Sequence, residues 1–276
     1  MSLNIGSAVR YGFDRLFERN GLLLVGVFVV VGLLGTVASQ TLTVGSAGFG
    51  TQPTGGTGGM TGIPGLMGAE ETPLALPLDA GAALGLGLAL TLVGAVAGEA
   101  LRIVADRTFV SEATEQLYEP SRNIVMATLF GIVAGIIAAV AVFIGTILLV
   151  VPGIYIGLGL FFFRQEIAVF DKGPVDALAD SWSLAKGHRW SLFGFAVVLV
   201  VVSLLVTAAN FVFILIAGPI AGSVVSILLG AFVGMFSSAA TAGAYRQLLG
   251  MKRPDAQFAL DSVNADRYGD IDEEWR

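Results

Sequence analysis

Three kinds of residue are absent or scarce in this chain of 276 amino acids, and each scarcity excludes a class of chemistry. There is no cysteine, which excludes disulfides, thiolate catalysis and cysteine-ligated metals. The only histidine, His188, lies in the segment Lys186-Gly187-His188-Arg189-Trp190, and one histidine between cations is a poor metal ligand and a poor general base. Charged residues make up only 13% of the chain, too few to cover the surface of a soluble domain.

Long apolar runs take the place of a polar surface. Hydrophobic residues account for 55% of the chain, and its mean hydropathy is +0.83. About 20 apolar helical residues cross a bilayer core of about 30 Å. Six runs predict transmembrane helices, at 21–44, 80–101, 124–151, 154–170, 192–217 and 220–245. Val151-Pro152-Gly153 and Gly218-Pro219 are the expected turns within two of the hairpins. The first run is longer than the apolar region of a signal peptide, so we expect an uncleaved anchor.

The basic residues predict how these spans are oriented, because Lys and Arg collect in cytoplasmic segments. They flank the spans on alternate sides only, and the opposite loops, 45–79, 152–153 and 218–219, contain none. We therefore expect a multi-pass protein of the cell membrane with both termini in the cytoplasm. Residues 1–250 are expected to form a single transmembrane domain with a flexible external loop at 45–79, and 251–276 an acidic cytoplasmic tail.

An amphipathic segment precedes each predicted hairpin. The apolar faces are Ile5, Val9, Phe13 and Leu16, then Val110, Ala113 and Leu117, and finally Val175, Leu178, Trp182 and Ala185. Such helices lie along the headgroup layer with the apolar face toward lipid, either as elbows that set the angle of the next span or as docking sites for a partner. The third has the most interfacial residues: Asp180, Trp182, Lys186, His188 and Trp190. The prediction is an all-α, polytopic membrane helical bundle of three hairpins, each preceded by an interfacial helix.

Charged residues inside the spans are the candidates for a functional site. Each costs about 2.5–3.5 kcal/mol at the bilayer centre, so it should face protein or water. Glu99 and Arg102 form an i,i+3 pair near the inner end of the second span, and Arg164 and Glu166 lie near the inner end of the fourth. We predict one polar cluster in which Glu99 pairs with Arg164. It either fixes helix register or forms a substrate or ion gate. The pattern predicts no catalytic, cofactor-binding or metal-binding residues.

Glycines at four-residue spacing predict close helix packing, within the chain or between two copies. The pairs are Gly81 with Gly85, Gly94 with Gly98, Gly131 with Gly135, and Gly230 with Gly234. Asn210 and Gln40 are expected to donate hydrogen bonds between helices. The expected partners are the lipid bilayer and, through the glycine faces, other membrane proteins or a second copy. An isoelectric point near 4.8 disfavours nucleic acid.

Two stretches carry a resemblance to a known family. They are Val151-Pro152-Gly153-Ile154-Tyr155, and the segment 177–194 with its Ala-Leu, Ser-Trp, Lys-Gly, Trp and Phe-Gly steps. The sequence resembles the membrane-domain family found in front of some glycerophosphodiester phosphodiesterases, and stand-alone uncharacterised membrane proteins, notably from haloarchaea. The match is close over 150–194, and the span layout extends it to most of the chain. An excess of Arg over Lys and acidic polar segments fit a high-salt cytoplasm.

The resemblance implies the membrane module alone. In that family the phosphodiesterase activity belongs to a separate barrel domain with His, Glu and Asp metal ligands, and this chain has a single histidine and no room for such a domain. The sequence therefore favours a non-enzymatic membrane module that organises partners or lipids. A small-solute or ion transporter or channel that uses the polar cluster is the alternative, and a dry Glu99–Arg164 pair would count against it. An intramembrane enzyme is the third hypothesis, and it lacks the paired carboxylates or activated nucleophile it would need.

Overall fold

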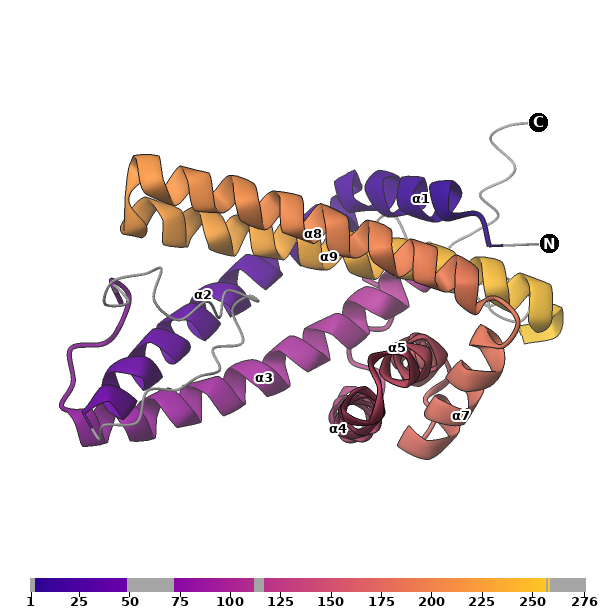
Figure 1. Ribbon diagram of the computed structural model, residues 1–276, viewed down its shortest axis with the longest axis horizontal. Helices are drawn as coiled ribbons and strands as arrows, with labels where there is room; N and C mark the ends of the chain where they lie inside the picture. Colours follow the sequence, from indigo (N-terminus) through magenta and orange to yellow (C-terminus); the bar gives the residue numbers. More distant parts are fainter. Residues whose placement is uncertain (1–2, 49–71, 112–116, 257, 259–276) are drawn as a thin grey trace. The chain divides into compact units, whose positions relative to one another are not determined.

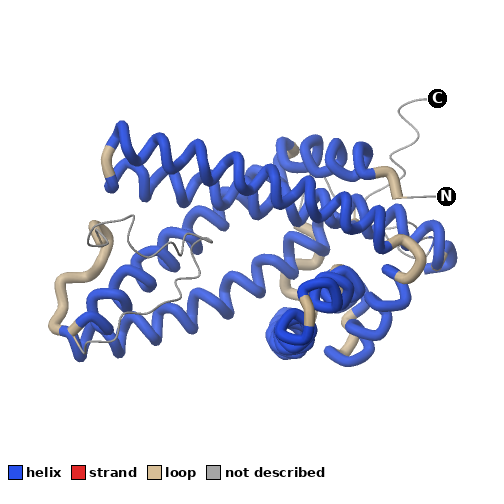
Figure 2. The backbone as a smooth tube through the Cα atoms, in the orientation of Figure 1, coloured by secondary structure: helices blue, strands red, loops and turns tan. Residues whose placement is uncertain are grey.

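The computed structural model describes residues 3–48, 72–111, 117–256 and 258, and in this part of the chain all regular structure is α-helical (Figures 1 and 2). The helices are α1 (Ile5–Phe17), α2 (Arg19–Ala47), α3 (Ala80–Val110), α4 (Ile124–Leu148), α5 (Val150–Gly159), α6 (Phe163–Phe170), α7 (Pro174–Ala185), α8 (Arg189–Ala217) and α9 (Pro219–Lys252). Within the described residues, 6 helical stretches are long and apolar enough to cross a membrane, the fourth being α5 and α6 together. The chain is therefore a multi-pass, all-α membrane protein, which confirms the predicted class.

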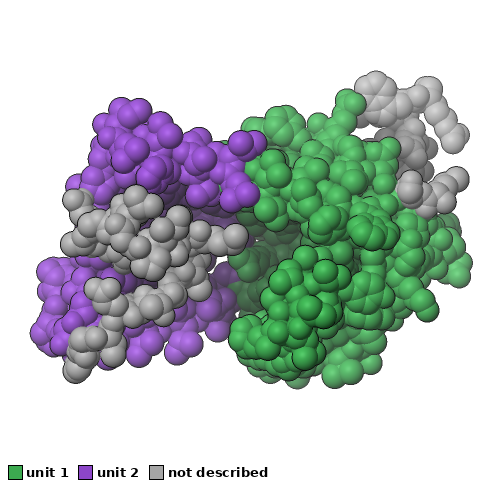
Figure 3. Space-filling view, viewed as in Figure 1, with its two compact units in different colours: residues 1–25, 99–203, 232–276 green, residues 26–98, 204–231 purple. Residues whose placement is uncertain are grey.

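The chain divides into two compact units (Figure 3). Unit 1 consists of residues 1–25, 99–203 and 232–276, and unit 2 of residues 26–98 and 204–231. The long helices α2, α3, α8 and α9 contribute residues to both. All 15 Lys and Arg residues of the sequence fall in the ranges of unit 1. Charge is thus strongly segregated between the two units.

Unit 2 is held together by close helix approaches and by side-chain hydrogen bonds. Gly45 of α2 lies against the backbone of Leu84 in α3, where a Cβ would overlap it. Asn210 of α8 donates a 2.6 Å hydrogen bond to the hydroxyl of Ser226 in α9, which confirms its predicted interhelical role. Gln40 Oε1 accepts a 2.7 Å hydrogen bond from the backbone N–H of Leu74, in the segment that leads into α3, and its role as an interhelical donor stays a prediction.

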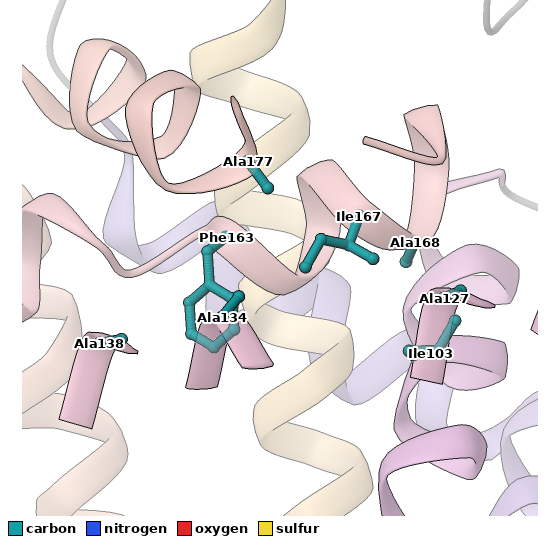
Figure 4. Packing of buried hydrophobic residues seen from close by; sticks show 8 residues of the cluster. All are labelled: Ile103, Ala127, Ala134, Ala138, Phe163, Ile167, Ala168 and Ala177. Carbon is teal, nitrogen blue, oxygen red and sulfur yellow. The ribbon is translucent and has the colours of Figure 1, made fainter. Parts of the chain in front are cut away.

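Small residues bring α4, α6 and α7 of unit 1 together. Figure 4 shows eight buried residues of this core, five of which are alanine. They are Ile103, Ala127, Ala134, Ala138, Phe163, Ile167, Ala168 and Ala177. Alanine lets helix backbones approach closely, which is how helices gain packing energy where lipid weakens the hydrophobic drive.

Most of the predicted Gly-xxx-Gly pairs are not used for packing inside the chain. An added Cβ would meet no other atom within 4 Å at Gly85, Gly94, Gly98 or Gly230. The closest helix approaches involve other glycines, such as Gly12 of α1, where a Cβ would lie 2.7 Å from that of Ala240 in α9. Packing between two copies through the open glycine faces stays a prediction.

The turn between the third and fourth spans lies at Leu149, so the predicted turn at Val151-Pro152-Gly153 is wrong. Leu149 is extended (φ −165°, ψ 147°) and is the only residue between α4 and α5. Pro152 lies in the first turn of α5, where the missing N–H breaks no helical hydrogen bond. Gly153 lies against α4: a side chain there would overlap the hydroxyl of Thr146 and lie 2.8 Å from its backbone nitrogen.

Replacement of Gly153 by alanine is expected to lower the free energy of unfolding by about 1–3 kcal/mol, because the added methyl group forces α4 and α5 apart. Gly157, one turn further along α5, is the matched control, since a Cβ there would be 3.7 Å from its nearest neighbour. Thermal unfolding of the purified variants in detergent measures the difference. Equal transition temperatures for Gly153→Ala and Gly157→Ala would show that the approach at Gly153 tolerates a side chain.

The fourth span is interrupted, and Ser181 of α7 fills the interruption. Residues 160–162 separate α5 from α6. The fully buried Ser181 hydroxyl accepts a 3.0 Å hydrogen bond from the backbone N–H of Phe162 and donates a 3.1 Å bond to the carbonyl of Gly159. Backbone groups released by a helix break must find partners inside the protein at membrane depth, and Ser181 provides one for each side of this break.

The first and third predicted interfacial helices are α1 and α7. Each packs small residues against unit 1, including Gly12 in α1 and Ala177 in α7. Part of each apolar face points outward, since Phe13 is 57% exposed, Phe17 52% and Val175 69%. Leu16 and Ala185 were also predicted on these faces, and this is wrong: both are buried against the rest of unit 1. Outward apolar faces on short helices are typical of helices that lie on lipid.

A second interfacial helix was expected with the apolar face Val110, Ala113 and Leu117, and the described residues of this segment do not form it. The helix α3 continues to Val110, and its last turn is buried in unit 1. Residues 117–123 form turns, with Glu119 (φ 39°) and Asn123 (φ 44°) in the left-handed region, and 112–116 lie outside the described residues. The carbonyls of Glu119 and Arg122 accept hydrogen bonds from the buried Arg107, so residues 119–122 fold onto the protein.

Candidate functional site

Glu99 of α3 and Arg164 of α6 form the predicted ion pair. Arg164 Nε lies 2.9 Å from Glu99 Oε1 and Nη2 lies 3.2 Å from Oε2, so both carboxylate oxygens accept from one guanidinium. The Glu99 side chain is 8% exposed and that of Arg164 is 35% exposed. Gly131 of α4 provides the space, since a Cβ there would lie 2.7 Å from Glu99 Oε1. The pairing of these two residues is therefore confirmed.

The other two members of the predicted cluster do not join this pair. Arg102 is exposed, and among the described residues no ion pair connects it to Glu99. Glu166 pairs with Lys172 and Arg253 instead. It lies two positions after Arg164, and two positions on an α-helix correspond to a rotation of about 200°, so the two side chains point to opposite sides of α6. The structure therefore divides the predicted cluster into two separate groups.

Asp106 is a further buried carboxylate near Glu99, and the sequence reasoning missed it. It is 2% exposed and accepts a 2.5 Å hydrogen bond from the Ser238 hydroxyl of α9. Glu99, Arg102 and Asp106 recur at helical spacing, so an extension of the second span past its predicted end at 101 would have revealed it.

Glu166 belongs to a closed ionic ring with Lys172, Asp180 and Arg253, called here the Glu166 ring. Lys172 Nζ lies 2.5 Å from carboxylate oxygens of both Glu166 and Asp180. Arg253 closes the ring, 3.2 Å from Glu166 and 2.9 Å from Asp180. The Tyr245 hydroxyl also donates to Glu166, at 3.1 Å. The ring balances two anions with two cations and joins α6 and α7 to the end of α9.

The electrostatics of the ring keep Asp180 ionised. Burial by itself raises the pKa of Asp180, but the hydrogen bonds and charges of Lys172 and Arg253 outweigh it and lower the pKa below its ordinary value. The stabilisation from this carboxylate is therefore present above its ordinary pKa and is lost as pH falls through the lowered one. Asp180, predicted as an interfacial residue, holds α7 to the rest of unit 1 through Lys172 and Arg253.

A second group, called here the Arg107 cap, consists of Arg107, Arg122, Glu119 and Asp171. The Arg107 side chain is wholly buried and donates to the carbonyls of Ala168 (2.7 Å), Arg122 (2.6 Å) and Glu119 (3.3 Å), and to Asp171 Oδ1 (3.0 Å). Arg122 donates to the carbonyl of Val169 at 2.9 Å. Two arginines thus bind carbonyls of the last turn of α6, which have no partner within the helix.

Sequence reasoning treated the arginines of the Arg107 cap as ordinary cytoplasmic charges. Their acceptors are mostly backbone carbonyls, and a backbone carbonyl exists at every position of a sequence. No spacing pattern could therefore have identified this group.

The remaining predicted residues lie around the turn between α7 and α8. The Arg189 guanidinium lies against two rings that are nearly perpendicular to each other, with its Cζ 3.8 Å from the ring centroid of Tyr155 and 4.2 Å from that of Trp182. Trp190 is 88% exposed. Lys186 and His188 form the turn itself, and Lys252 donates to the carbonyl of Lys186.

The fold and the site define a multi-pass helical membrane protein. Within unit 1, two charge-balanced groups, the Glu166 ring and the Arg107 cap, connect the ends of helices to one another. Residues 3–248 match the family described as Domain of unknown function (DUF7847), and because the match covers most of the sequence, the chain belongs to that family. No curated protein matches the chain, and no solved structure does.

Proposed function

We propose that the chain is a non-enzymatic membrane module whose unit 1 presents a fixed surface that organises partners or lipids. One observation carries this proposal: the buried charges of the site are occupied by protein. Glu99 has both oxygens on Arg164, Glu166 accepts from three side chains, and the buried Arg107 donates to four acceptors. Buried groups that are satisfied in this way rigidify a fold.

A transporter or channel is the second candidate, and the interrupted fourth span favours it. Broken membrane helices line substrate and ion sites in many transporters, because their free backbone groups can bind the solute. In this chain Ser181 already binds the backbone on both sides of the break. The break therefore supports a structural role more strongly than a transport role.

Flux measurements separate the two candidates. The purified chain is reconstituted into sealed vesicles, and H⁺, Na⁺ and K⁺ fluxes are recorded for the wild type and for Glu99→Gln. If the chain is a non-enzymatic module, the ion fluxes of the wild type and of Glu99→Gln should both equal the flux of protein-free vesicles. Flux in the wild type that disappears in Glu99→Gln would overturn the module in favour of a transporter.

We also propose that the chain lies in the cell membrane with both termini in the cytoplasm. The confinement of all 15 Lys and Arg to the ranges of unit 1 supports this orientation, as does their absence from 45–79.

Cysteine labelling tests this orientation, since the chain has no native cysteine and each substitution provides one reactive thiol. Thr57→Cys, in the loop outside the described residues, is expected to react with a membrane-impermeant maleimide in intact cells. Ala179→Cys, on the exposed side of α7, is expected to react only after permeabilisation. Ala179 is preferred to Ser183 because the Ser183 hydroxyl accepts a hydrogen bond from Arg253. The reverse labelling pattern would invert the orientation.

The relation to the membrane domains of glycerophosphodiester phosphodiesterases is also a proposal, as is an origin in a haloarchaeal, high-salt cytoplasm. The segment that carries the resemblance, 150–194, forms α5, α6, α7 and the start of α8, a continuous part of unit 1. A structure of such a domain is expected to show the same interruption of its fourth span with a hydroxyl in the break. An uninterrupted span there would contradict the relation.

A further inference from the structure

We propose that the turn between α7 and α8 binds the phosphate of an anionic phospholipid, with Lys186 and Lys252 as its cationic contacts and the charge of Arg189 beside them. This inference rests on the proposed function and names one ligand for the module. It follows from the charge balance of unit 1, from the way Arg189 is held, and from the aromatic residues beside it.

The charge at this turn is uncompensated, unlike the charge elsewhere in the site. The Glu166 ring and the Arg107 cap each contain two anions and two cations. Among the described residues, by contrast, no carboxylate lies within ion-pair distance of Lys186, Arg189 or Lys252. Three positive charges therefore gather at one turn, and no anion in the described ranges balances them.

The geometry holds two of these cations in place. The Arg189 guanidinium lies against the rings of both Tyr155 and Trp182, and these two cation–π contacts hold it beside the turn. Its Nε and Nη2 are buried and have no hydrogen-bond partner in the described part of the chain, so Arg189 acts on the turn through its charge. Lys252 Nζ donates to the carbonyls of Ser183 (2.9 Å) and Lys186, which places the ammonium beside the same turn and leaves one of its three donors.

The surrounding side chains indicate the depth of the turn in the membrane. Trp190 is 88% exposed, Tyr155 51% and Trp182 36%. Exposed tryptophan and tyrosine next to the first residue of a spanning helix are typical of the headgroup layer. At that depth the abundant anion is the lipid phosphate, and clustered Lys and Arg are the side chains that recognise it.

Native mass spectrometry of the full chain in a neutral detergent tests the proposal, with equimolar phosphatidylglycerol and phosphatidylcholine as competing probes. We expect phosphatidylglycerol to be retained preferentially. Lys186→Gln is expected to weaken its retention about fivefold, since one cation near a lipid surface contributes about 1 kcal/mol. The side chain of Lys186 is exposed, so this variant should fold normally. Arg10→Gln is the matched control, because Arg10 is an exposed cation on α1.

Three results would overturn the proposal. Equal retention of the two lipids, or equal retention by Lys186→Gln and Arg10→Gln, would show that the turn does not recognise the headgroup. Displacement of phosphatidylglycerol by inorganic phosphate at the same concentration would identify a soluble phosphate as the ligand in place of a lipid. The proposed function is tested separately by the flux measurement. If the lipid experiment fails but the vesicles show no flux, the proposed module is retained and only the lipid site is rejected.

Discussion

Replacement of Glu166 by glutamine is expected to lower the free energy of unfolding by about 3 kcal/mol. Glutamine keeps the shape of the side chain but removes the charge that faces Lys172 and Arg253, and the loss of one partner of a buried ion pair costs about 3–5 kcal/mol. We expect the lower end of that range because the side chains of Lys172 and Arg253 are 24% and 25% exposed, so water can solvate them in part. Thermal or denaturant unfolding in detergent measures the loss.

Two further variants make this prediction specific to the ring. Asp14→Asn removes one partner of the exposed Arg10–Asp14 pair, whose side chains are 85% and 64% exposed, and should change stability by less than about 0.5 kcal/mol. Glu166→Gln combined with Lys172→Gln removes one charge of each sign and should recover part of the loss. If Glu166→Gln unfolds at the same point as Asp14→Asn, the ring contributes nothing to the fold.

Replacement of Arg107 by lysine is expected to destabilise the protein by about 2–3 kcal/mol, although the charge is kept. The guanidinium reaches three carbonyls and one carboxylate in different directions, and a lysine ammonium with three donors at one point cannot satisfy all four. Each buried acceptor left without a partner costs about 1–3 kcal/mol. Unfolding of the purified variant in detergent tests the size of the effect.

Hydrogen exchange should show where the Arg107→Lys variant loosens. We expect faster exchange in the turns at 117–123 and at the end of α6, because Arg107 holds the backbone of both. Arg10→Lys is the matched control and should exchange like the wild type. Equal exchange rates at 117–123 in Arg107→Lys and Arg10→Lys would mean that the guanidinium of Arg107 does not hold the turns.

Both predictions concern parts of unit 1 where distant segments of the sequence meet. Arg253 and Glu166 are 87 positions apart, and Arg107 and Ala168 are 61 apart. If unit 1 is a fixed platform, as the proposed function requires, loss of either contact should loosen the whole platform. The binding of lipid at the α7–α8 turn should then weaken in Glu166→Gln as well.

The fold class followed from the sequence because its cause is local. A span needs about 20 apolar residues to match the bilayer, so run length alone located the spans and the hairpin turn at Gly218-Pro219. Gly218 has φ +83°, a conformation that glycine adopts without strain. The Glu99–Arg164 pair was also predictable, because an uncompensated charge within a span must find an opposite charge, and few were available.

Tertiary structure decided the features that depend on shape. The turn at Leu149 could not be predicted from Pro152 and Gly153, because proline fits the first turn of a helix as well as a turn between helices. The close approach of Gly153 to Thr146 placed both residues inside the hairpin. Likewise α3 extends past 101 because its last turns are buried in unit 1, where apolar run length no longer sets the end of a helix.

The sequence by itself therefore determined that this is a multi-pass helical membrane protein, with spans set by the thickness of a bilayer and positive charge confined to one set of segments. The structure alone decided which charges meet. A carboxylate such as Glu166 can pair with any cation that the fold brings within about 4 Å, and a guanidinium such as Arg107 can bind any free carbonyl. Those choices depend on how helices pack around small residues, and packing is a property of the folded chain that sequence spacing does not encode.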